Sequence, residues 1–452
     1  MQSTSLELDA AQTEAISLCC DVTKRIVAVT GPAGTGKTSI LRQGYVQLAY
    51  HGYRCVLAAP TGKAAKRIKE ATGIPAMTIH RLLEYTHPGV PDPDTGEVAD
   101  SSGPRRTREH PLDMDVIFID EAAMIDMGLY RNLIDAMKSG SAVRFFGDAN
   151  QLPPIEDGYT GTSAFVQLLQ ASHIPSVKLT TIYRQGEGSS IVRNGANILR
   201  GIAPVRYDDF GISISPTPII RVGEVCRKLL AKDDPLFVSV RNQIITPMRQ
   251  GKVGSLALNN ILADIYDPGG DEVHLPRHPH ETKKTGQAYY RCKVGHKVIV
   301  QANMYDLRET IEERYHEDTW IPAQDHQMAF NGETGIVLSI DDGYITIDLG
   351  DRVVVFPPSL EVRTQSGYVT IVDPRREIEL AYAITTHKAQ GSEYDALIYM
   401  ISSSGSFNQC RANFYTGITR ARKQVMVIAD ERSLRSYSLR REQPTYKPLV
   451  KK

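Results

Sequence analysis

The segment from Gly31 to Thr38, GPAGTGKT, combines three glycines, a lysine and a threonine at a fixed spacing. The spacing fits the pattern G-x-x-x-x-G-K-[ST], in which glycines such as Gly34 and Gly36 let backbone N–H groups surround a polyphosphate. Lys37 is expected to reach the β- and γ-phosphates of a nucleoside triphosphate, and Thr38 to hold Mg²⁺. Because the segment directly follows the apolar run RIVAVT, it predicts a strand, loop and helix that bind such a nucleotide.

Two adjacent carboxylates, Asp120 and Glu121, directly follow the apolar run VIFI. Such a run is typical of a buried strand, and α/β proteins bind ligands at the carboxyl ends of these strands. Asp120 is suited to holding Mg²⁺ through water, and Glu121 to polarising the water that attacks a phosphate. Because binding alone does not need the second carboxylate, the pair favours a nucleotide hydrolase over a protein that only binds nucleotide.

A third apolar run, VRFF, ends in the segment GDANQLPP, which contains Gln151. An amide side chain beyond a sheet edge can hydrogen-bond a γ-phosphate and lose that bond when the phosphate leaves. We therefore predict that Gln151 senses the state of the nucleotide.

The sheet that positions these groups is expected from four short apolar runs separated by helical patterns, at residues 25–30, 54–59, 116–119 and 143–146. This alternation is typical of a parallel α/β sheet. Between residues 294 and 372 the pattern changes to short alternating runs with Gly, Asp and Asn turns, which predicts a small antiparallel barrel. Parallel patterning then returns with ALIYMIS and KQVMVIA, so the barrel is expected to be inserted in a second α/β domain.

The composition is that of an ordinary globular protein, with 452 residues, 41% of them hydrophobic, and 52 Lys and Arg against 52 Asp and Glu. The zero net charge argues against a protein that coats nucleic acid by charge alone, although a local basic groove remains compatible with it. No run approaches the roughly 20 apolar residues that span a bilayer, so no membrane contact is expected. The start of the chain lacks the pattern of a secretory signal, and we expect a soluble, cytoplasmic protein.

The ordered set of these segments closely resembles superfamily 1 helicases, and within them the RecD-like and Dda-like 5′→3′ group, superfamily 1B. The resemblance covers nearly the whole chain. It implies two RecA-like P-loop domains that bind ATP and Mg²⁺ between them. It also implies a small hairpin insertion in the first domain and an SH3-like β-barrel insertion in the second, whose hairpin the segment FNGETG matches.

The resemblance implies further residues of the nucleotide site. Gln12, in LDAAQ, is expected to read the adenine edge. Arg184 and Arg420, in LTTIYRQ and YTGITRAR, are expected to reach the γ-phosphate and stabilise the charge that spreads in the transition state. Gly391 and Glu393, in THKAQGSE, are expected to contact the nucleotide, with Glu393 at the ribose.

The resemblance also implies residues that grip single-stranded DNA in both domains. By their chemistry, hydroxyl, lysine and histidine groups at strand-to-helix junctions bind any anionic backbone, and only the resemblance points to DNA. The residues are Pro60, Thr61, Lys63, His80 and Arg81 in the first domain, and Thr246, His387 and Lys388 in the second.

The chain is expected to divide at the points where its pattern changes. The predicted parts are a first motor domain at 1–195 with a pin-like insertion at 86–113, a second motor domain at 196–293 and 373–430, the barrel at 294–372, and a basic tail at 431–452. Two features depart from the family pattern. The insertion has no Phe, Tyr or Trp to stack on a base pair, and Ala123 stands where relatives usually have Ser.

We therefore expect an ATP-dependent DNA helicase that moves 5′→3′ on single-stranded DNA, unwinds at single-strand/duplex junctions and acts as a monomer. One alternative is a superfamily 1 RNA helicase, because motor motifs barely separate DNA from RNA. A second is an ATP-switched subunit or translocase of a DNA repair or recombination complex that unwinds little. A regulatory P-loop ATPase unrelated to nucleic acid is the third.

Overall fold

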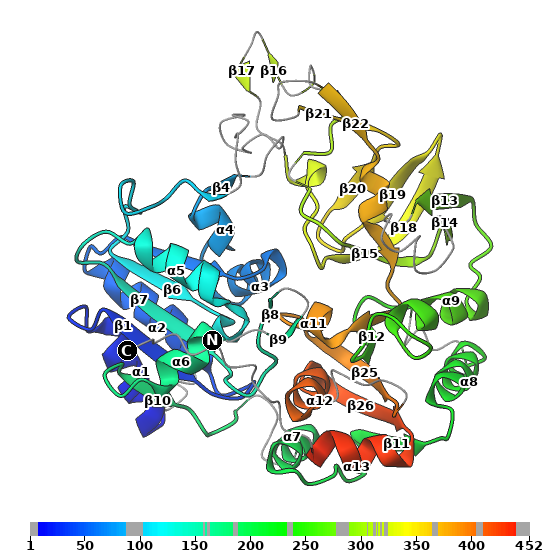
Figure 1. The fold of residues 1–452 in the computed structure, drawn as a ribbon, viewed down its shortest axis with the longest axis horizontal. Coiled ribbons are helices and arrows are strands. Elements are labelled where there is room, and N and C mark those ends of the chain that lie inside the picture. The colour runs from blue at the N-terminus through cyan, green and yellow to red at the C-terminus, as the bar shows by residue number, and fades with distance from the viewer. Residues whose placement is uncertain are drawn as a thin grey trace, which may run out of the picture.

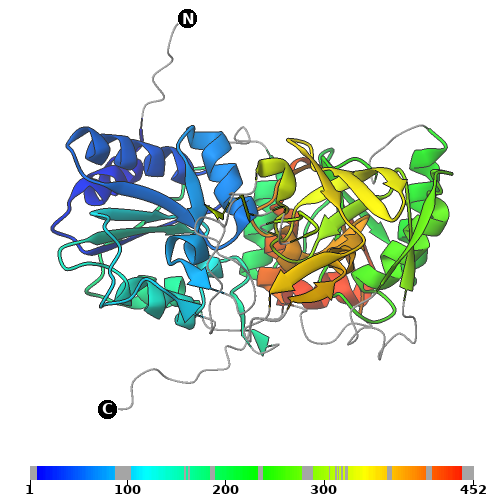
Figure 2. The ribbon, with the colours of Figure 1, turned by 90° about the horizontal axis from the view of Figure 1, so that it is seen from above.

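The fold is described from a computed structural model of the chain, drawn in Figures 1 and 2. The structure describes residues 8–86, 103–156, 159–160, 163–183, 189–232, 238–276, 289–304, 306–310, 313, 315–316, 319–320, 324–363, 369–403 and 410–439. Within these ranges no helix is both long enough and apolar enough to cross a membrane. We call residues 8–183 the first half and residues 189–439 the second half; Figure 2 shows them side by side.

The first half is built on a six-stranded parallel sheet with the order β10-β1-β7-β6-β2-β3. Its strands are β1 (Ile26–Thr30), β2 (Cys55–Ala59), β3 (Ala76–Thr78), β6 (Val116–Ile119), β7 (Ala142–Gly147) and β10 (Ser176–Lys178). The four predicted runs are all strands of this sheet. The edge strands β3 and β10 are three residues long, too short to produce a recognisable apolar run.

Helices enclose this sheet on both faces, which explains why its central strands are buried and mostly apolar. Alternate residues of a strand point to opposite faces, so Val27 and Val29 join one buried cluster and Ala28 the other. The helices are α1 (Ala10–Cys20), α2 (Lys37–Tyr50), α3 (Gly62–Thr72), α4 (Ile79–Leu82), α5 (Met127–Asp135) and α6 (Ala164–Gln170), with a short 3₁₀ turn, η1, at Ala122–Met124.

The second half contains another parallel sheet, of five strands in the order β11-β26-β25-β12-β24. They are β11 (Phe210–Ile214), β12 (Asn242–Thr246), β24 (Ala383–Thr385), β25 (Tyr394–Ile401) and β26 (Ala421–Ala429). Its helices are α7 (Ser190–Arg200), α8 (Pro218–Leu230), α9 (Ser255–Ile265), α11 (Thr386–Ala389), α12 (Arg411–Ile418) and α13 (Glu431–Leu439). Helix α7, which spans the predicted boundary at residue 195, packs against α12 and β26.

An antiparallel sheet is inserted in the second half between β12 and β24. In Figure 1 it lies above the parallel sheet of that half. Its strands, in the order β20-β19-β18-β15-β23, are β15 (Lys297–Val300), β18 (Thr334–Asp341), β19 (Tyr344–Asp348), β20 (Val353–Phe356) and β23 (Ile378–Leu380). The four predicted alternating runs correspond to β15 and β18 to β20. Two further ribbons, β13 (Glu272–Pro276) with β14 (Tyr289–Lys293) and β21 (Leu360–Arg363) with β22 (Val369–Val372), extend the antiparallel structure.

The structure describes only parts of the predicted pin-like insertion and of the predicted basic tail. Most of the pin-like insertion, residues 87–102, lies outside the described residues, and its ends pair as β4 (Tyr85–Thr86) and β5 (Gly103–Pro104). The basic tail was expected to be solvated from residue 431. Its first nine residues instead form α13, which packs against α12 and α7 through the buried Tyr437, while residues 440–452 lie outside the described part.

Candidate active site and nucleic-acid interface

The loop from Gly31 to Thr38 turns between β1 and α2 with two residues in the left-handed backbone region. Gly34 has a φ of 86° and Gly36 a φ of 84°, which side chains other than that of glycine rarely adopt. A Cβ at Gly36 would also lie 2.8 Å from Nε2 of Gln12. The glycine spacing therefore meets both a backbone requirement and a space requirement.

Lys37 lies inside this loop and is held by the loop's own backbone. Its Nζ donates hydrogen bonds to the carbonyl oxygens of Gly31 at 2.7 Å and Pro32 at 2.8 Å. Burial lowers the pKa of Lys37, and the negative charges of Asp148 and Asp120 oppose that shift. A cation thus lies where the loop's backbone would surround phosphate oxygens, and the partly buried Thr38 follows it on the first turn of α2.

Asp120 and Glu121 stand directly after β6, as predicted. Burial, together with the neighbouring charge of Glu121, raises the pKa of Asp120 to about 6. The Oδ1 atom of Asp120 accepts a hydrogen bond from the backbone N–H of Glu121 at 2.8 Å. Glu121 has a φ of 51°, an unfavourable conformation for a residue with a Cβ and one that clusters at functional sites. A buried carboxylate with a raised pKa fits a site that receives a cation such as Mg²⁺.

The segment from Asp148 to Pro154, which contains the predicted sensor, joins the two halves. The hydroxyl of Tyr415 donates to Oδ2 of Asp148 at 2.7 Å, and the N–H of Leu152 donates to Oγ1 of Thr416 at 2.9 Å. Gln151 is buried beside them, and its Oε1 has no hydrogen-bond partner among the described residues. Such an unsatisfied acceptor is consistent with a polar partner that binds there.

Of the two arginines predicted to reach the γ-phosphate, the structure describes Arg420 but not Arg184. Arg420 is buried in the second half, where its Nε donates to the carbonyl oxygen of Thr416 at 3.1 Å. Burial and the neighbouring Asp148 raise the pKa of Tyr415, and the charge of Arg420 opposes that shift. Arg420 therefore lies next to the contact between Tyr415 and Asp148. Arg184 lies outside the described residues, so its position stays a prediction.

Gln12, the predicted adenine reader, lies against the phosphate-binding loop. Its Nε2 donates to the carbonyl oxygen of Thr35 at 3.2 Å, and its Oε1 accepts from the N–H of Asp9 at 3.2 Å in a capping box of α1. Asp9 also accepts a hydrogen bond from the hydroxyl of Tyr183 at 2.8 Å. The amide of Gln12 thus forms local bonds that fix it beside Gly36, and these bonds were not expected from the sequence.

Glu393 is the centre of a contact between the halves that the sequence did not predict. Its carboxylate forms an ion pair with Arg67 of α3 and accepts from Nε of Arg422 at 2.8 Å. The other amino group of Arg67 lies 3.6 Å from Oε1 of Glu121. Gly391 packs nearby: a Cβ added to it would lie 3.4 Å from the Cβ of Ala64 in α3. Arg67 was not among the residues predicted from the sequence; the signal that could have found it is its place one helical turn after Lys63.

A cavity separates the phosphate-binding loop from the second half. Its lining comes from the loop, the end of the first half, α7, α12 and the beginnings of β25 and β26. The residues are Pro32, Ala33, Ile182, Ile191, Val192, Ala196, Leu199, Glu393, Tyr415, Thr419, Ala421 and Arg422. Pro32 and Ala33 of the loop therefore face the paired Glu393 and Arg422 of the second half, and most of the remaining lining is apolar.

The residues predicted to bind DNA in the first half lie around the beginnings of α3 and α4. Thr61 follows Pro60 and caps α3 by accepting from the N–H of Ala64, and Thr78 caps α4 by accepting from the N–H of Arg81. His80 packs edge-on against Tyr85, with ring centroids 4.8 Å apart. Helix beginnings of this kind present N–H groups to an anionic backbone.

In the second half the predicted DNA residues divide into two groups. Lys388 donates through Nζ to Oδ1 of Asn331 at 2.8 Å, and burial lowers the pKa of the adjacent His387 to about 4. Thr246 does not reach the surface, because it is only 1% exposed and its hydroxyl donates to the carbonyl oxygen of Val253. The expectation that Thr246 caps a DNA phosphate is therefore not supported, and its hydroxyl instead stabilises the turn after β12.

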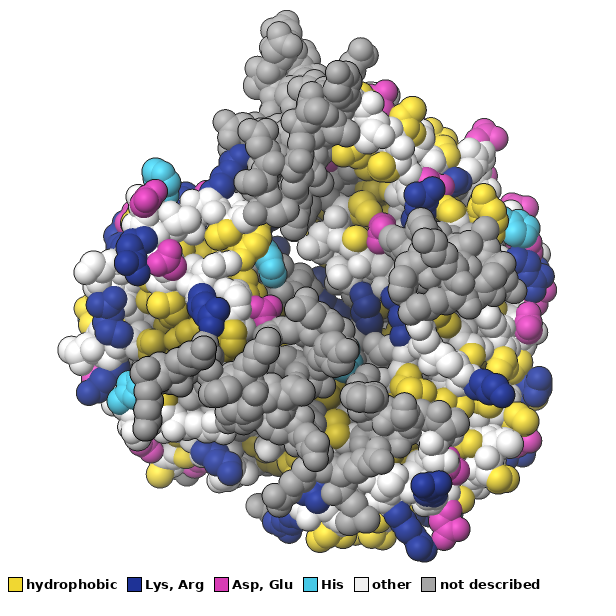
Figure 3. All heavy atoms as spheres, viewed as in Figure 1, with side chains coloured by type: hydrophobic (Ala, Val, Ile, Leu, Met, Phe, Trp, Pro, Cys, Tyr) yellow, Lys and Arg dark blue, Asp and Glu magenta, His cyan; other side chains and the backbone are white. Residues whose placement is uncertain are grey.

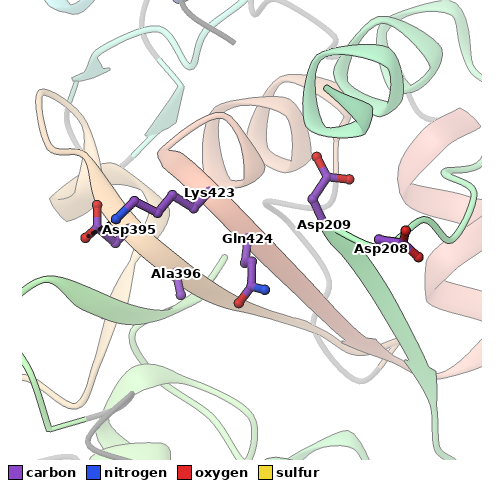
Figure 4. A pocket seen from close by; sticks show the side chains of 6 residues that line it. All are labelled: Asp208, Asp209, Asp395, Ala396, Lys423 and Gln424. Carbon is purple, nitrogen blue, oxygen red and sulfur yellow. Dashed lines mark hydrogen bonds and ion pairs between the residues drawn. The ribbon is translucent and has the colours of Figure 1, made fainter. Parts of the chain in front are cut away.

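A second hollow lies at the beginnings of β11, β25 and β26, and Figure 4 shows it from close by. Lys423 extends there towards Asp395, to which it is paired at 3.1 Å, while Asp209 accepts from the backbone N–H of Ser190 at 3.2 Å. None of the residues predicted for nucleotide or DNA lines this hollow. It is therefore separate from the candidate site.

Comparisons with known proteins agree with this geometry. A family model described as an AAA domain matches residues 7–209, and one described as a UvrD-like helicase C-terminal domain matches residues 380–428. The ATP-dependent RecD2 DNA helicase of Deinococcus radiodurans is 29% identical over 398 residues, which are 88% of this chain and 46% of that protein. The RecD subunit of the RecBCD enzyme of Mycolicibacterium smegmatis is 27% identical over 448 residues, which are 91% of this chain and 69% of that subunit. The chain thus spans about half the length of the first of these two relatives.

Solved structures of similar fold include Bacteroides Pif1 bound to ssDNA, with a TM-score of 0.54 and 20% sequence identity, covering 95% of this chain and 94% of that one. A structure of two coordinating Pif1 helicases at forked dsDNA has a TM-score of 0.56 and 21% identity, covering 94% of this chain and 92% of that one. At this identity the likeness concerns the fold.

Proposed function

We propose that the chain is a RecD-like superfamily 1 helicase, an ATP-dependent DNA helicase that moves 5′→3′ on single-stranded DNA. The observation that carries the proposal is the cavity in which the phosphate-binding loop of one half faces Glu393 and Arg422 of the other. A nucleotide bound there contacts both halves, so its hydrolysis changes how they are held together.

ATP is the substrate of this site, with its phosphates in the loop around Lys37. Glu121 orients the water that attacks the γ-phosphorus, and Arg420 supplies positive charge from the opposite side. Arg184 is proposed from the sequence alone as a second such arginine. Thr38 and Asp120 would hold Mg²⁺, which neutralises phosphate charge when bound.

Single-stranded DNA is proposed to run across the face where the two halves and the antiparallel sheet meet. Lys63 of the first half and Lys388 of the second both donate hydrogen bonds to the same turn, residues 330–332. Figure 3 shows dark-blue lysine and arginine side chains bordering the hollow at the centre of this face. Contacts to the DNA backbone through such groups bind most sequences similarly.

The finer architecture is proposed on the same basis. The antiparallel sheet is interpreted as an SH3-like barrel, and the parallel sheets as RecA-like motor domains with the boundaries expected from the sequence. The packing of α7 on α12 favours placing that helix in the second motor domain. Residues 86–113 stay a proposed strand-separating pin.

A second candidate is a motor subunit of a larger DNA-processing complex. It is favoured by the similarity to the RecD subunit of the RecBCD enzyme. Purified protein that hydrolyses ATP on single-stranded DNA but separates no strands would favour this candidate over a helicase that acts alone.

The first test is the ATPase rate of the purified chain with and without single-stranded DNA. Lys37→Ala is expected to lower the DNA-stimulated rate by about 10²-fold or more, because the cation that stabilises the phosphates is lost. Lys24→Ala, a substitution outside the loop, serves as the matched control. Full activity of Lys37→Ala would refute the assignment of the nucleotide site.

The direction of movement is tested with duplexes that carry a 5′ or a 3′ single-stranded tail. We expect unwinding of the 5′-tailed duplex, and preference for the 3′ tail would refute the proposed polarity. Matched RNA strands, added as competitors of DNA-stimulated hydrolysis, distinguish a DNA helicase from an RNA helicase. Stronger stimulation by RNA would favour the latter.

A further inference from the structure

Arg67 lies between two carboxylates that belong to different halves of the molecule. One of its amino groups forms a hydrogen-bonded ion pair with Glu393 of the second half. The other lies 3.6 Å from Oε1 of Glu121 of the first half. Nε of Arg422 donates to the second carboxylate oxygen of Glu393 at 2.8 Å. Four side chains of alternating charge therefore form a row across the cleft between the two halves: Glu121, Arg67, Glu393 and Arg422.

These contacts are shielded from water to different degrees. The side chain of Glu393 is 7% exposed, that of Glu121 is 15% exposed and that of Arg67 is 30% exposed. Ion pairs in such partly buried positions are screened less than pairs on the surface. Arg67 gives its hydrogen bond to Glu393 and the longer contact to Glu121, so Glu393 is its principal partner in this arrangement.

Opening of the cleft affects the two carboxylate partners of Arg67 differently, because only one of them lies in the same half as Arg67. Arg67 lies on α3, and Glu121 follows β6 in the same half, so the two remain neighbours. Glu393 and Arg422 lie at the beginnings of β25 and β26 in the other half. Separation of the halves therefore removes Glu393 from Arg67 and leaves Arg67 beside Glu121.

We propose that Arg67 is a positioning residue whose ion-pair partner changes from Glu121 to Glu393 when the cleft closes. In the open cleft Arg67 pairs with Glu121, and a carboxylate whose lone pairs are engaged by a guanidinium does not orient the attacking water. In the closed cleft Glu393 takes the hydrogen bond of Arg67, and Glu121 keeps only the longer contact, which leaves its lone pairs available to the attacking water. This inference rests on the proposed ATPase function and adds a link between hydrolysis and cleft closure.

The test measures kcat and KM for ATP in the presence of single-stranded DNA for Glu393→Gln, Arg67→Ala and the double variant. Glu393→Gln is expected to lower kcat roughly three- to tenfold, the scale of one partly exposed ion pair, because Arg67 then stays on Glu121. Adding Arg67→Ala is expected to raise kcat again. Arg67→Ala alone is expected to raise the rate without DNA and so to reduce the stimulation by DNA.

Two outcomes would overturn the inference. If both single variants lower kcat and the double variant shows the product of the two losses, Arg67 only supports the fold or the closed cleft. A Glu393→Gln effect confined to the KM for ATP would mean that Glu393 serves only the nucleotide itself. Arg67→Gln, which keeps most of the side-chain volume, repeats the experiment with a smaller disturbance of α3.

The matched control is Lys69→Ala, because Lys69 is an exposed cation on the same helix. It is expected to change neither kcat nor stimulation by DNA. A wild-type protein without ATP hydrolysis would overturn the proposed function together with the inference. An active wild type with multiplied losses would overturn the inference alone.

Discussion

Arg144 shows how one residue can carry a structural task that its sequence context hides. It lies in the central strand β7 and is fully buried, where its guanidinium donates to the carbonyl oxygens of Cys19 at 2.7 Å, Lys24 at 2.8 Å and Asp21 at 2.9 Å. Burial lowers the pKa of Arg144. These acceptors lie at the end of α1 and in the turn after it, so one side chain ties that turn to the sheet that carries the nucleotide site.

Arg144→Met is expected to lower the free energy of unfolding by about 2–4 kcal/mol, because buried carbonyl oxygens lose their donors while the volume stays filled. Chemical denaturation at neutral pH measures this change. Arg131→Met, on the exposed side of α5, is the control and is expected to change stability by no more than about 0.5 kcal/mol. An equally small effect at Arg144 would contradict the structural role.

At the scale of elements, the segment 148–154 links the two halves through several hydrogen bonds. It follows β7 in the first half and contacts α11 and α12 in the second. Besides the bonds from Tyr415 and to Thr416, Nε2 of Gln390 donates to the carbonyl oxygen of Leu152 at 2.9 Å. Because these bonds are buried, a shift of the segment when Gln151 gains or loses a partner would displace both helices.

Thr416→Val tests this coupling, because valine keeps the shape of threonine but leaves the N–H of Leu152 without its acceptor. A buried hydrogen bond contributes about 1 kcal/mol, so we expect DNA-stimulated kcat to fall roughly fivefold. Thr72→Val, whose hydroxyl bonds only within the first half, should keep the stimulation by DNA. Equal stimulation in the wild type and Thr416→Val would argue against coupling through this segment.

At the scale of the whole molecule, three parts converge on the turn at residues 330–332. Lys63 of α3 donates to the carbonyl oxygen of Gly332 at 3.4 Å, and Lys388 of α11 contacts Asn331. Lys66 of α3 also pairs with Asp351 of the antiparallel part at 2.7 Å. The zero net charge of the chain is thus compatible with nucleic-acid binding, since Lys63, Lys66 and Lys388 lie where the parts meet.

Lys63→Ala and Lys388→Ala are each expected to weaken binding of single-stranded DNA and to reduce the slope of log affinity against log salt by about 0.7 per lost phosphate contact. Fluorescence titration of a labelled oligonucleotide at several salt concentrations measures both quantities. Lys69→Ala, on the exposed side of α3, is the control. A weaker affinity with an unchanged slope would indicate that these lysines hold the parts together rather than contacting phosphate.

The sequence by itself determined the elements whose residues are neighbours in the chain. The apolar runs are strands, and Gly34 and Gly36 of the phosphate-binding loop have the positive φ that glycine readily adopts, because backbone preference and period are local properties. The change to an antiparallel pattern was visible for the same reason. Short strands such as β3 and β10, and the helix α13 within the expected tail, carry too little pattern to be recognised.

Only the tertiary structure decided which side chains meet. Arg67 and Glu393 are 326 positions apart, and their ion pair depends on how two independently patterned sheets pack. The same packing buries Thr246, gives Arg144 its carbonyl partners and closes the cavity around the nucleotide site. Such contacts have no local signature, because the distance between two side chains across an interface depends on every element that supports them.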